Sequence, residues 1–146
     1  DLWLPLRPGS DSALALAMLR TIIYEGLYDF AFVRDWCQDF DALKEHVRDY
    51  TPEWAAPLTW LTPDQIRAAA RMYAGNKPGC IQWGCTWDQL GTASTTTSLT
   101  LALMRAICGN LDVPGGDGMP GPALNFLTDE EMEAMCAACE DILKGI

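Results

Sequence analysis

The clearest candidate for ligand chemistry in this chain is the pair Ser10-Asp11, near its start. An extended run at residues 2–6 meets the turn-forming pair Pro8-Gly9, and a long apolar stretch with helical spacing follows. A strand, a tight glycine turn and a helix start together form a common nucleotide site. An acidic side chain there repels phosphate, but it suits guanine, because one carboxylate can accept hydrogen bonds from both the ring N–H and the exocyclic amine. The alternative is a plain helix start, with Ser10 as N-cap and Asp11 favoured by the helix dipole.

A second candidate is the loop at residues 83–89, which contains Gly84, Cys85 and Gln89. It follows residues 79–84, a short apolar run bounded by glycines that predicts a buried parallel strand. Ligands of α/β folds bind at the carboxyl ends of such strands. Gly84 would let a flat ring or a pyrophosphate approach the backbone, and Gln89 offers both a donor and an acceptor. The alternative is a surface loop whose two tryptophans pack on the core.

The cysteines and the histidine do not predict a metal or catalytic site. Cys136 and Cys139 form a CxxC inside an expected helix, without a second pair or a nearby histidine, whereas zinc and iron–sulfur sites take four ligands. We expect two thiols on a helix face there, with a thiol redox or metal protein as the alternative. The six cysteines should be reduced, because a chain this apolar needs no disulfides. His46, the only histidine, lies among charged residues, and no pairing with a serine or cysteine nucleophile is indicated.

The composition indicates a folded, acidic domain. With 146 residues, 49% of them hydrophobic and 21% charged, the chain can bury a core. Its net charge of −10 argues against nucleic acid as a partner, because phosphates would be repelled. No apolar stretch is long enough for a membrane span. The chain begins at Asp1, without a methionine, and we interpret it as a piece of a longer protein.

The hydrophobic spacing predicts a mostly helical chain with one or two short strands. Because one or two strands do not make a stable sheet, the expected fold class is an α/β fragment whose other strands are missing. We treat residues 1–146 as a single fragment with a helical part, 1–76, and a strand–loop–helix part, 77–146. A short turn is expected at residues 51–53. The helices are expected at residues 11–25, 30–36, 41–50, 63–73, 95–108 and 128–143, with Asp29 and Thr62 among the caps.

Several stretches, in order along the chain, resemble one enzyme family. LPLRPGSDSALALAMLRTIIYEGLYD, residues 4–29, is similar to the Pro-Gly-(Ser/Thr)-Asp segment and following helix of the molybdopterin-guanine-dinucleotide oxidoreductases, the dimethyl-sulfoxide-reductase family. YTPE at 50–53, CIQWGCTWDQ at 80–89 and LMRAICGNLDVPGG at 103–116 resemble further segments of the same family. The matching pieces follow the family's order and cover about residues 2–118.

This resemblance implies a place in a cofactor cradle within Rossmann-like cofactor-binding domains. Ser10 and Asp11 would hold one guanine of a molybdopterin guanine dinucleotide, and Gly84, Cys85 and Gln89 would line the pterin side. The parent enzyme would carry molybdenum or tungsten on two such cofactors. The family's metal ligand and iron–sulfur motif lie upstream of this region, so the chain alone is expected to hold no metal, to retain no cofactor and to be inactive.

The resemblance is incomplete after the glycine-rich loop at residues 109–116, where Asn110 could be a left-handed helix cap. Many relatives continue with an Arg-Gly-Gln-Asn-Asn type segment that contacts the pterin. This chain has MPGPALNF at 119–126 instead, without an arginine, which indicates a divergent branch.

The implied partners are the remainder of the parent chain and a possible electron-transfer subunit. The parent's compartment, bacterial cytoplasm or periplasm, stays open, as does its substrate. Removing neighbours exposes apolar faces, so the fragment is expected to self-associate. The alternative from another class is a small acidic helical interaction module with no cofactor, which the many amphipathic helices would also fit.

Overall fold

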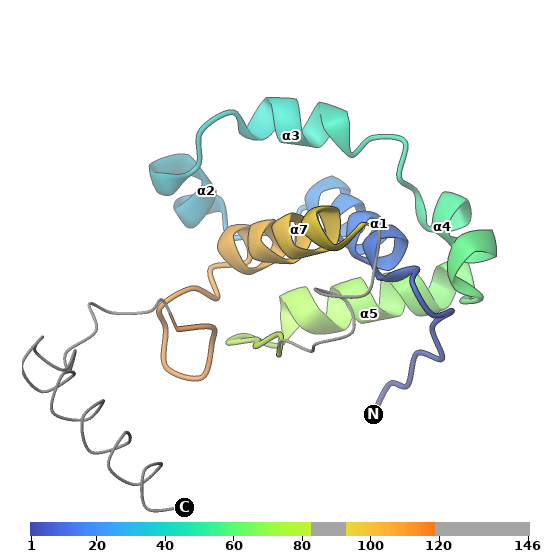
Figure 1. The fold of residues 1–146 in the computed structure, drawn as a ribbon. Helices are drawn as coiled ribbons and strands as arrows, with labels where there is room; N and C mark the ends of the chain where they lie inside the picture. The colour runs from blue at the N-terminus through green and yellow to red at the C-terminus, as the bar shows by residue number, and fades with distance from the viewer. Residues whose placement is uncertain (83–92, 119–146) are drawn as a thin grey trace, which may run out of the picture.

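Helix α1 (Asp11–Tyr24) lies in the middle of the structure, and the other helices pack around it (Figure 1). The computed structural model describes residues 1–82 and 93–118. The helices in contact with α1 are α3 (Phe40–His46), α4 (Pro52–Thr59), α5 (Pro63–Gly75) and α7 (Ser94–Ile107), and α2 (Phe30–Trp36) packs on α7. The prediction of a mostly helical chain is confirmed.

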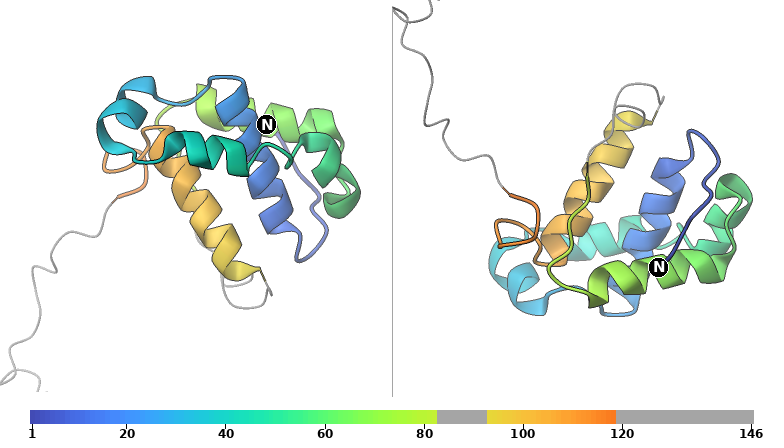
Figure 2. Two further views of the ribbon diagram at one scale, coloured as in Figure 1. Left: turned by 90° about the horizontal axis from the view of Figure 1, so that it is seen from above. Right: turned by 90° about the horizontal axis from the view of Figure 1, so that it is seen from below.

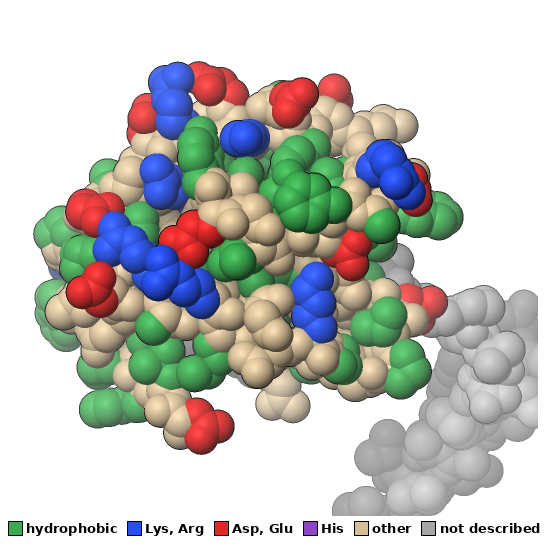
Figure 3. Space-filling view, turned by 180° about the vertical axis from the view of Figure 1, so that it is seen from behind, with side chains coloured by type: hydrophobic (Ala, Val, Ile, Leu, Met, Phe, Trp, Pro, Cys, Tyr) green, Lys and Arg blue, Asp and Glu red, His purple; other side chains and the backbone are tan. Residues whose placement is uncertain are grey.

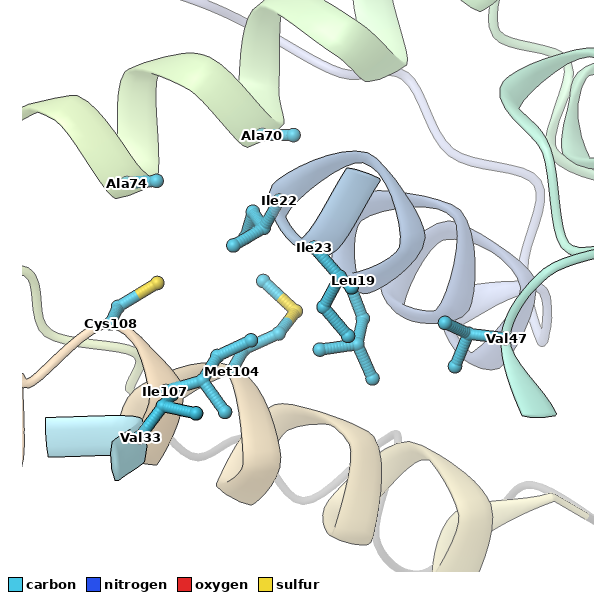
Figure 4. Packing of buried hydrophobic residues seen from close by; sticks show 10 residues of the cluster. All are labelled: Leu19, Ile22, Ile23, Val33, Val47, Ala70, Ala74, Met104, Ile107 and Cys108. Atoms are coloured by element: carbon cyan, nitrogen blue, oxygen red, sulfur yellow. The ribbon is translucent and has the colours of Figure 1, made fainter. Parts of the chain in front are cut away.

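The main core lies where α1 passes between α5 and α7. Figure 4 shows Ile22 of α1 directed into the space between Ala70 of α5 and Met104 of α7. Small side chains on α5 allow this close packing. A second, smaller cluster joins α1 to α4 and α5. The buried members of the two clusters are Leu19, Ile22, Ile23, Val33, Val47, Ala70, Ala74, Met104, Ile107 and Cys108, and Ala17, Ala55, Leu61 and Ile66.

Local capping signals fix several helix starts. Thr62 caps α5 as predicted, and it does so in a capping box: the Gln65 N–H donates to Thr62 Oγ1 (3.2 Å), and the Thr62 N–H donates to Gln65 Oε1 (2.9 Å). Asp29 caps α2 as predicted, because its Oδ1 accepts the N–H of Phe32 at 2.9 Å. The turn expected at residues 51–53 is in fact the start of a full helix, α4, capped by Thr51.

The predicted strand is wrong in its described part. Residues 79–82 have no strand partner, and the only β interaction among the described residues is an isolated bridge between Leu111 and Asp117. The physical reason is that a strand requires a neighbouring ladder, and the described part of the chain supplies none beside residues 79–82. Residues 2–6 likewise form no strand. Helix α3 ends at His46, four residues before the predicted end at residue 50.

The surface mixes both signs of charge. Figure 3 shows acidic and basic side chains interspersed on the face opposite to that of Figure 1. Ion pairs account for part of this pattern, including Arg71 with Glu25 and Arg67 with Glu53. Among the helices that the structure describes, none is both long and apolar enough to cross a lipid bilayer. The helix predicted at 128–143, with Cys136 and Cys139, lies outside the described residues.

Candidate functional site

Asp11 lies on the wall of a pocket of about 240 Å³. The pocket is enclosed by the first turns of α1, the end of α5, helix α7 and the segment that follows α5. Figure 2 (right) shows this segment rising between α1 and α7, toward the ends at which both helices begin. The lining residues are Asp11, Leu14, Ala15, Met18, Tyr73, Ile81, Gln82, Thr97, Leu101 and Met104. The pocket is therefore mostly apolar, with a few polar groups at its wall.

One of these polar groups, the Asp11 side chain, lacks a partner within the described part of the chain. The Asp11 carboxylate makes no hydrogen bond or ion pair there. The Tyr73 hydroxyl is buried next to the Asn110 side chain, and burial raises the pKa of Tyr73 to about 12. Thr97 differs, because its hydroxyl already donates to the carbonyl oxygen of Ala93 (3.1 Å). A ligand in the pocket would thus meet one carboxylate, that of Asp11, without a partner among the described residues.

Ser10 is placed differently from Asp11. Ser10 is the N-cap residue of α1, as the sequence indicated, but its hydroxyl donates to the carbonyl oxygen of Arg7 (2.6 Å) and makes no side-chain capping bond to α1. The reason is the tight turn at Gly9, whose φ of +80° brings both Ser10 N and Ser10 Oγ to the Arg7 carbonyl. Ser10 lines a separate pocket of about 360 Å³ with Arg7 and Trp54. The structure therefore separates the two neighbouring candidate residues.

The predicted contacts Gly84, Cys85 and Gln89 lie outside the described residues. The described residues on the two sides of this loop are informative, however. Gln82 precedes the loop and Thr97 lies in the first turn of α7 after it, and both line the pocket that contains Asp11. Described residues before and after the loop therefore line the same pocket as Asp11.

The glycine-rich loop holds the segment before this loop in place. Asn110 is fully buried, and its Oδ1 accepts the N–H of Gly79 at 3.1 Å. The left-handed residue after α7 is Gly109, with φ of +68°, so the prediction of Asn110 in that role is wrong. Glycine takes this conformation without the steric cost of a Cβ, which leaves Asn110 free to turn inward.

Sequence reasoning missed the ion pair between Arg105 and Asp117. Arg105 Nε lies 3.1 Å from Asp117 Oδ2, and Arg105 Nη2 donates to the carbonyl oxygen of Ile81 at 2.6 Å. Asp117 Oδ2 also accepts the N–H of Ile81 (3.3 Å), and Asp117 Oδ1 accepts from Cys80 Sγ (3.5 Å). The available signal was that Arg105 is the only charged residue of an apolar helix, since a charge buried there must be paired.

The described thiols are not activated. Burial raises the pKa of Cys37 and of Cys80, and raises that of Cys108 to about 11. A reactive thiol needs the opposite shift, because the thiolate is the nucleophile. All three cysteines are free, and no group of three or more metal-ligating side chains occurs in residues 1–82 and 93–118.

The chain is similar to several individual proteins, although no family model matches it. It is 39% identical over 122 residues to acetylene hydratase of Syntrophotalea acetylenica, covering 84% of this chain and 16% of that protein. It is 40% identical over 115 residues to formate dehydrogenase H of Escherichia coli (strain K12), covering 78% and 16%. The molybdopterin-containing subunit of the arsenate respiratory reductase of Shewanella sp. (strain ANA-3) is 28% identical over 167 residues, covering 99% and 19%.

The fold agrees with these sequence matches. The solved structure of acetylene hydratase from Pelobacter acetylenicus matches with a TM-score of 0.72 and 41% sequence identity, over 75% of this chain and 15% of that one. The chain thus spans less than a fifth of the length of these relatives, whose shares are 16%, 16% and 19%. The chain belongs to the dimethyl-sulfoxide-reductase family of molybdopterin oxidoreductases and corresponds to one segment of such an enzyme.

Proposed function

We propose that this chain contributes to the cofactor cradle of a molybdenum- or tungsten-dependent oxidoreductase, with Asp11 binding the guanine of a molybdopterin guanine dinucleotide. The observation that carries the proposal is the position of the Asp11 carboxylate, which is without a partner in the described residues and lies on the wall of a pocket. Gln82 and Thr97, on the two sides of the predicted cofactor loop, line the same pocket.

The pocket has the size of one ring system. Small-molecule sites usually enclose about 300–1,000 Å³, and this pocket encloses about 240 Å³. It can therefore take a purine, while the rest of a dinucleotide would extend out of it. The apolar side chains of Leu14 and Leu101 suit the faces of a flat ring, and the polar groups suit its edge.

The polar groups of the pocket match the edge of guanine. Asp11 can accept from the ring N–H and the exocyclic amine together, which a neutral acceptor cannot do as strongly. Its place in the first turn of α1 favours the negative charge through the helix dipole. Ser10 would act indirectly, by holding the turn that presents Asp11.

The remaining contacts follow from the family resemblance. Gly84, Cys85 and Gln89 would approach the pterin side from the loop that starts at Gln82. When bound, the cofactor supplies two-electron redox chemistry at its metal, and the residues of this chain bind and orient it. The parent's further parts, including Rossmann-like cofactor-binding domains and an electron-transfer partner, belong to this proposal. A cofactor-free interaction module is not favoured, because the matched relatives are enzymes.

The test is Asp11→Asn in the full-length protein, with Asp64→Asn as matched control. Asp64 also lies in the first turn of a helix, α5, but is exposed and paired with Arg67. Hydrogen bonds to a charged group contribute about 1.5–3 kcal/mol each, so Asp11→Asn should lower bound guanine nucleotide and pterin about 10- to 100-fold. Asp64→Asn should leave both unchanged. Wild-type protein that is active without molybdenum, tungsten or guanine nucleotide would refute the proposal.

A further inference from the structure

The segment at residues 79–82 has no neighbouring strand among the described residues, and side chains bond its backbone instead. The N–H of Gly79 is bonded by Asn110 Oδ1 (3.1 Å). Both polar groups of the Ile81 backbone are bonded as well: the N–H by Asp117 Oδ2 (3.3 Å) and the carbonyl by Arg105 Nη2 (2.6 Å). In a β-ladder, alternate residues of one strand bond to the same neighbour. Here Gly79 and Ile81 alternate in that way, and three side chains take the neighbour's place.

The ion pair at the centre of this arrangement is buried. The side chains of Arg105 and Asp117 are 5% and 13% exposed. Desolvating two charges costs so much that a buried ion pair is often no better for stability than apolar side chains of similar volume. Stabilisation alone therefore explains the pair poorly. Its distinctive feature is that both charged groups also bond the backbone of one residue, Ile81.

The loop that carries Asp117 is itself fixed. The Asp117 N–H donates to the carbonyl oxygen of Asn110, and the Asp112 N–H donates to that of Asp117, both at 2.9 Å. Gly116 has no room for a side chain, because a Cβ there would lie 2.3 Å from the Asn110 carbonyl oxygen. Asp117 is thus presented to Ile81 by a tight loop, and Arg105 by a helix.

We propose that Arg105, Asp117 and Asn110 are positioning residues that place residues 79–82 at the Asp11 pocket. This inference rests on the proposed function, because the pocket is the place where the cofactor would bind. Ile81 and Gln82 line the pocket, so releasing Ile81 moves its wall. Loss of the group should lower cofactor retention although Asp11 itself is unchanged.

The test compares two double variants of the full-length protein. Arg105→Met with Asp117→Asn removes both charges together, so that no buried charge is left unpaired. The control is Arg71→Met with Glu25→Gln, which removes an ion pair of the same chemistry, with contacts of 2.7 and 2.9 Å, on the exposed side of α5. Arg105→Lys is the conservative variant, because lysine keeps a charge and a donor but lacks the guanidinium fork.

Two readouts separate this inference from the proposed function. The first is hydrogen–deuterium exchange of the amides at residues 79–82, which needs no cofactor. The second is the rate at which bound pterin is lost from the purified protein. We expect the Arg105/Asp117 double variant to raise both at least tenfold, while amides of α1 and α5 exchange as in wild type. The control should change neither readout, and Arg105→Lys should recover part of both.

Each outcome of these measurements tests a separate part of the inference. The positioning role is overturned if the folded double variant exchanges its amides at residues 79–82 at the wild-type rate. If the double variant does not fold, the single variants Arg105→Lys and Asp117→Asn provide the same test. Faster exchange with unchanged pterin loss overturns its link to the cofactor. A wild-type protein without pterin refutes the proposed function, and the exchange result then still decides whether these residues position the segment.

Discussion

Gly109 follows the end of α7, but replacing it by alanine should destabilise the start of another helix, α2. Gly109 has a φ of +68°, and a Cβ built there would lie 2.8 Å from Asp29 Oδ2. Asp29 caps α2, since its Oδ1 accepts the N–H of Phe32 at 2.9 Å. Its own N–H donates to the carbonyl oxygen of Ile107 at 2.7 Å. The backbone of Asp29 is thus held, and its side chain must move to admit the new methyl group.

The expected loss can be worked out from two other glycines of the same chain. Gly9 has a φ of +80° with no atom within 4 Å of its would-be Cβ, so Gly9→Ala adds only the cost of left-handed backbone, about 1–2 kcal/mol. Gly75 is helical, and its Cβ would also meet no atom within 4 Å, so Gly75→Ala should stabilise by about 0.5–1 kcal/mol. Gly109→Ala combines the left-handed cost with loss of a helix cap worth about 1 kcal/mol, in total about 2–3 kcal/mol.

Urea unfolding at constant m-value measures the three variants against wild type. We expect Gly75→Ala to be more stable than wild type, Gly9→Ala to be less stable than wild type, and Gly109→Ala to be the least stable of the four proteins. A double-mutant cycle with Asp29→Ala isolates the contact, and the coupling should be about 1 kcal/mol. Equal losses for Gly9→Ala and Gly109→Ala, with no coupling to Asp29, would refute the contact. A destabilising Gly75→Ala would refute the backbone argument itself.

Three further results are expected. Thr62→Ala should lower the free energy of unfolding by about 1 kcal/mol in urea titrations, because the Gln65 N–H loses its acceptor; a change below a few tenths would contradict the role of the capping box. Burial raises the pKa of Cys108 from 9.0 to about 11 and that of Tyr73 from 10.0 to about 12, so the folded state holds both protons more tightly than the unfolded chain. Their stabilisation should be complete below pH 9 and should be lost as pH rises through 11 and 12; a urea midpoint that stays constant over this range would contradict it. Leu99 is 60% exposed beside an apolar groove between α1, α3 and α7, so Leu99→Gln should reduce self-association of residues 1–146 in light scattering, and an unchanged mass at high concentration would exclude this face.

Helix starts could be predicted from the sequence because their causes are local. Thr62 and Gln65 are three residues apart and bond each other's backbone, so the spacing alone is sufficient. The same holds for Asp29 and the N–H of Phe32. The hydroxyl of Ser10 could not be placed from local sequence, because it can bond either to the first turn of α1 or to the preceding turn. The glycine turn brings the Arg7 carbonyl within 2.6 Å, and the hydroxyl bonds there instead of capping α1.

The position of Asp11 could be predicted, but its surroundings could not. A turn followed by a helix places the carboxylate at a helix start whatever the rest of the chain does. The neighbours Tyr73 and Thr97 come from helices far along the sequence, and they meet Asp11 only through the packing of α5 and α7 on α1. No spacing rule links residues so far apart. The family resemblance suggested the proposed role of Asp11, and the fold supplies the pocket.

The missing strand and the unexpected ion pair have one explanation. The apolar run bounded by glycines indicated a strand at residues 79–84, but a strand also needs the bonds of a neighbouring strand, and residues 79–82 have none in the described part of the chain. The bonds of Gly79 and Ile81 on one edge are made by Asn110, Arg105 and Asp117. A lone arginine in an apolar helix is costly unless its charge is paired and its donors are used. Arg105 donates to the Ile81 carbonyl oxygen and pairs with the Asp117 carboxylate. Because no neighbouring strand in the described part of the chain bonds the Ile81 carbonyl, that oxygen is available to Arg105, and the arginine can be buried.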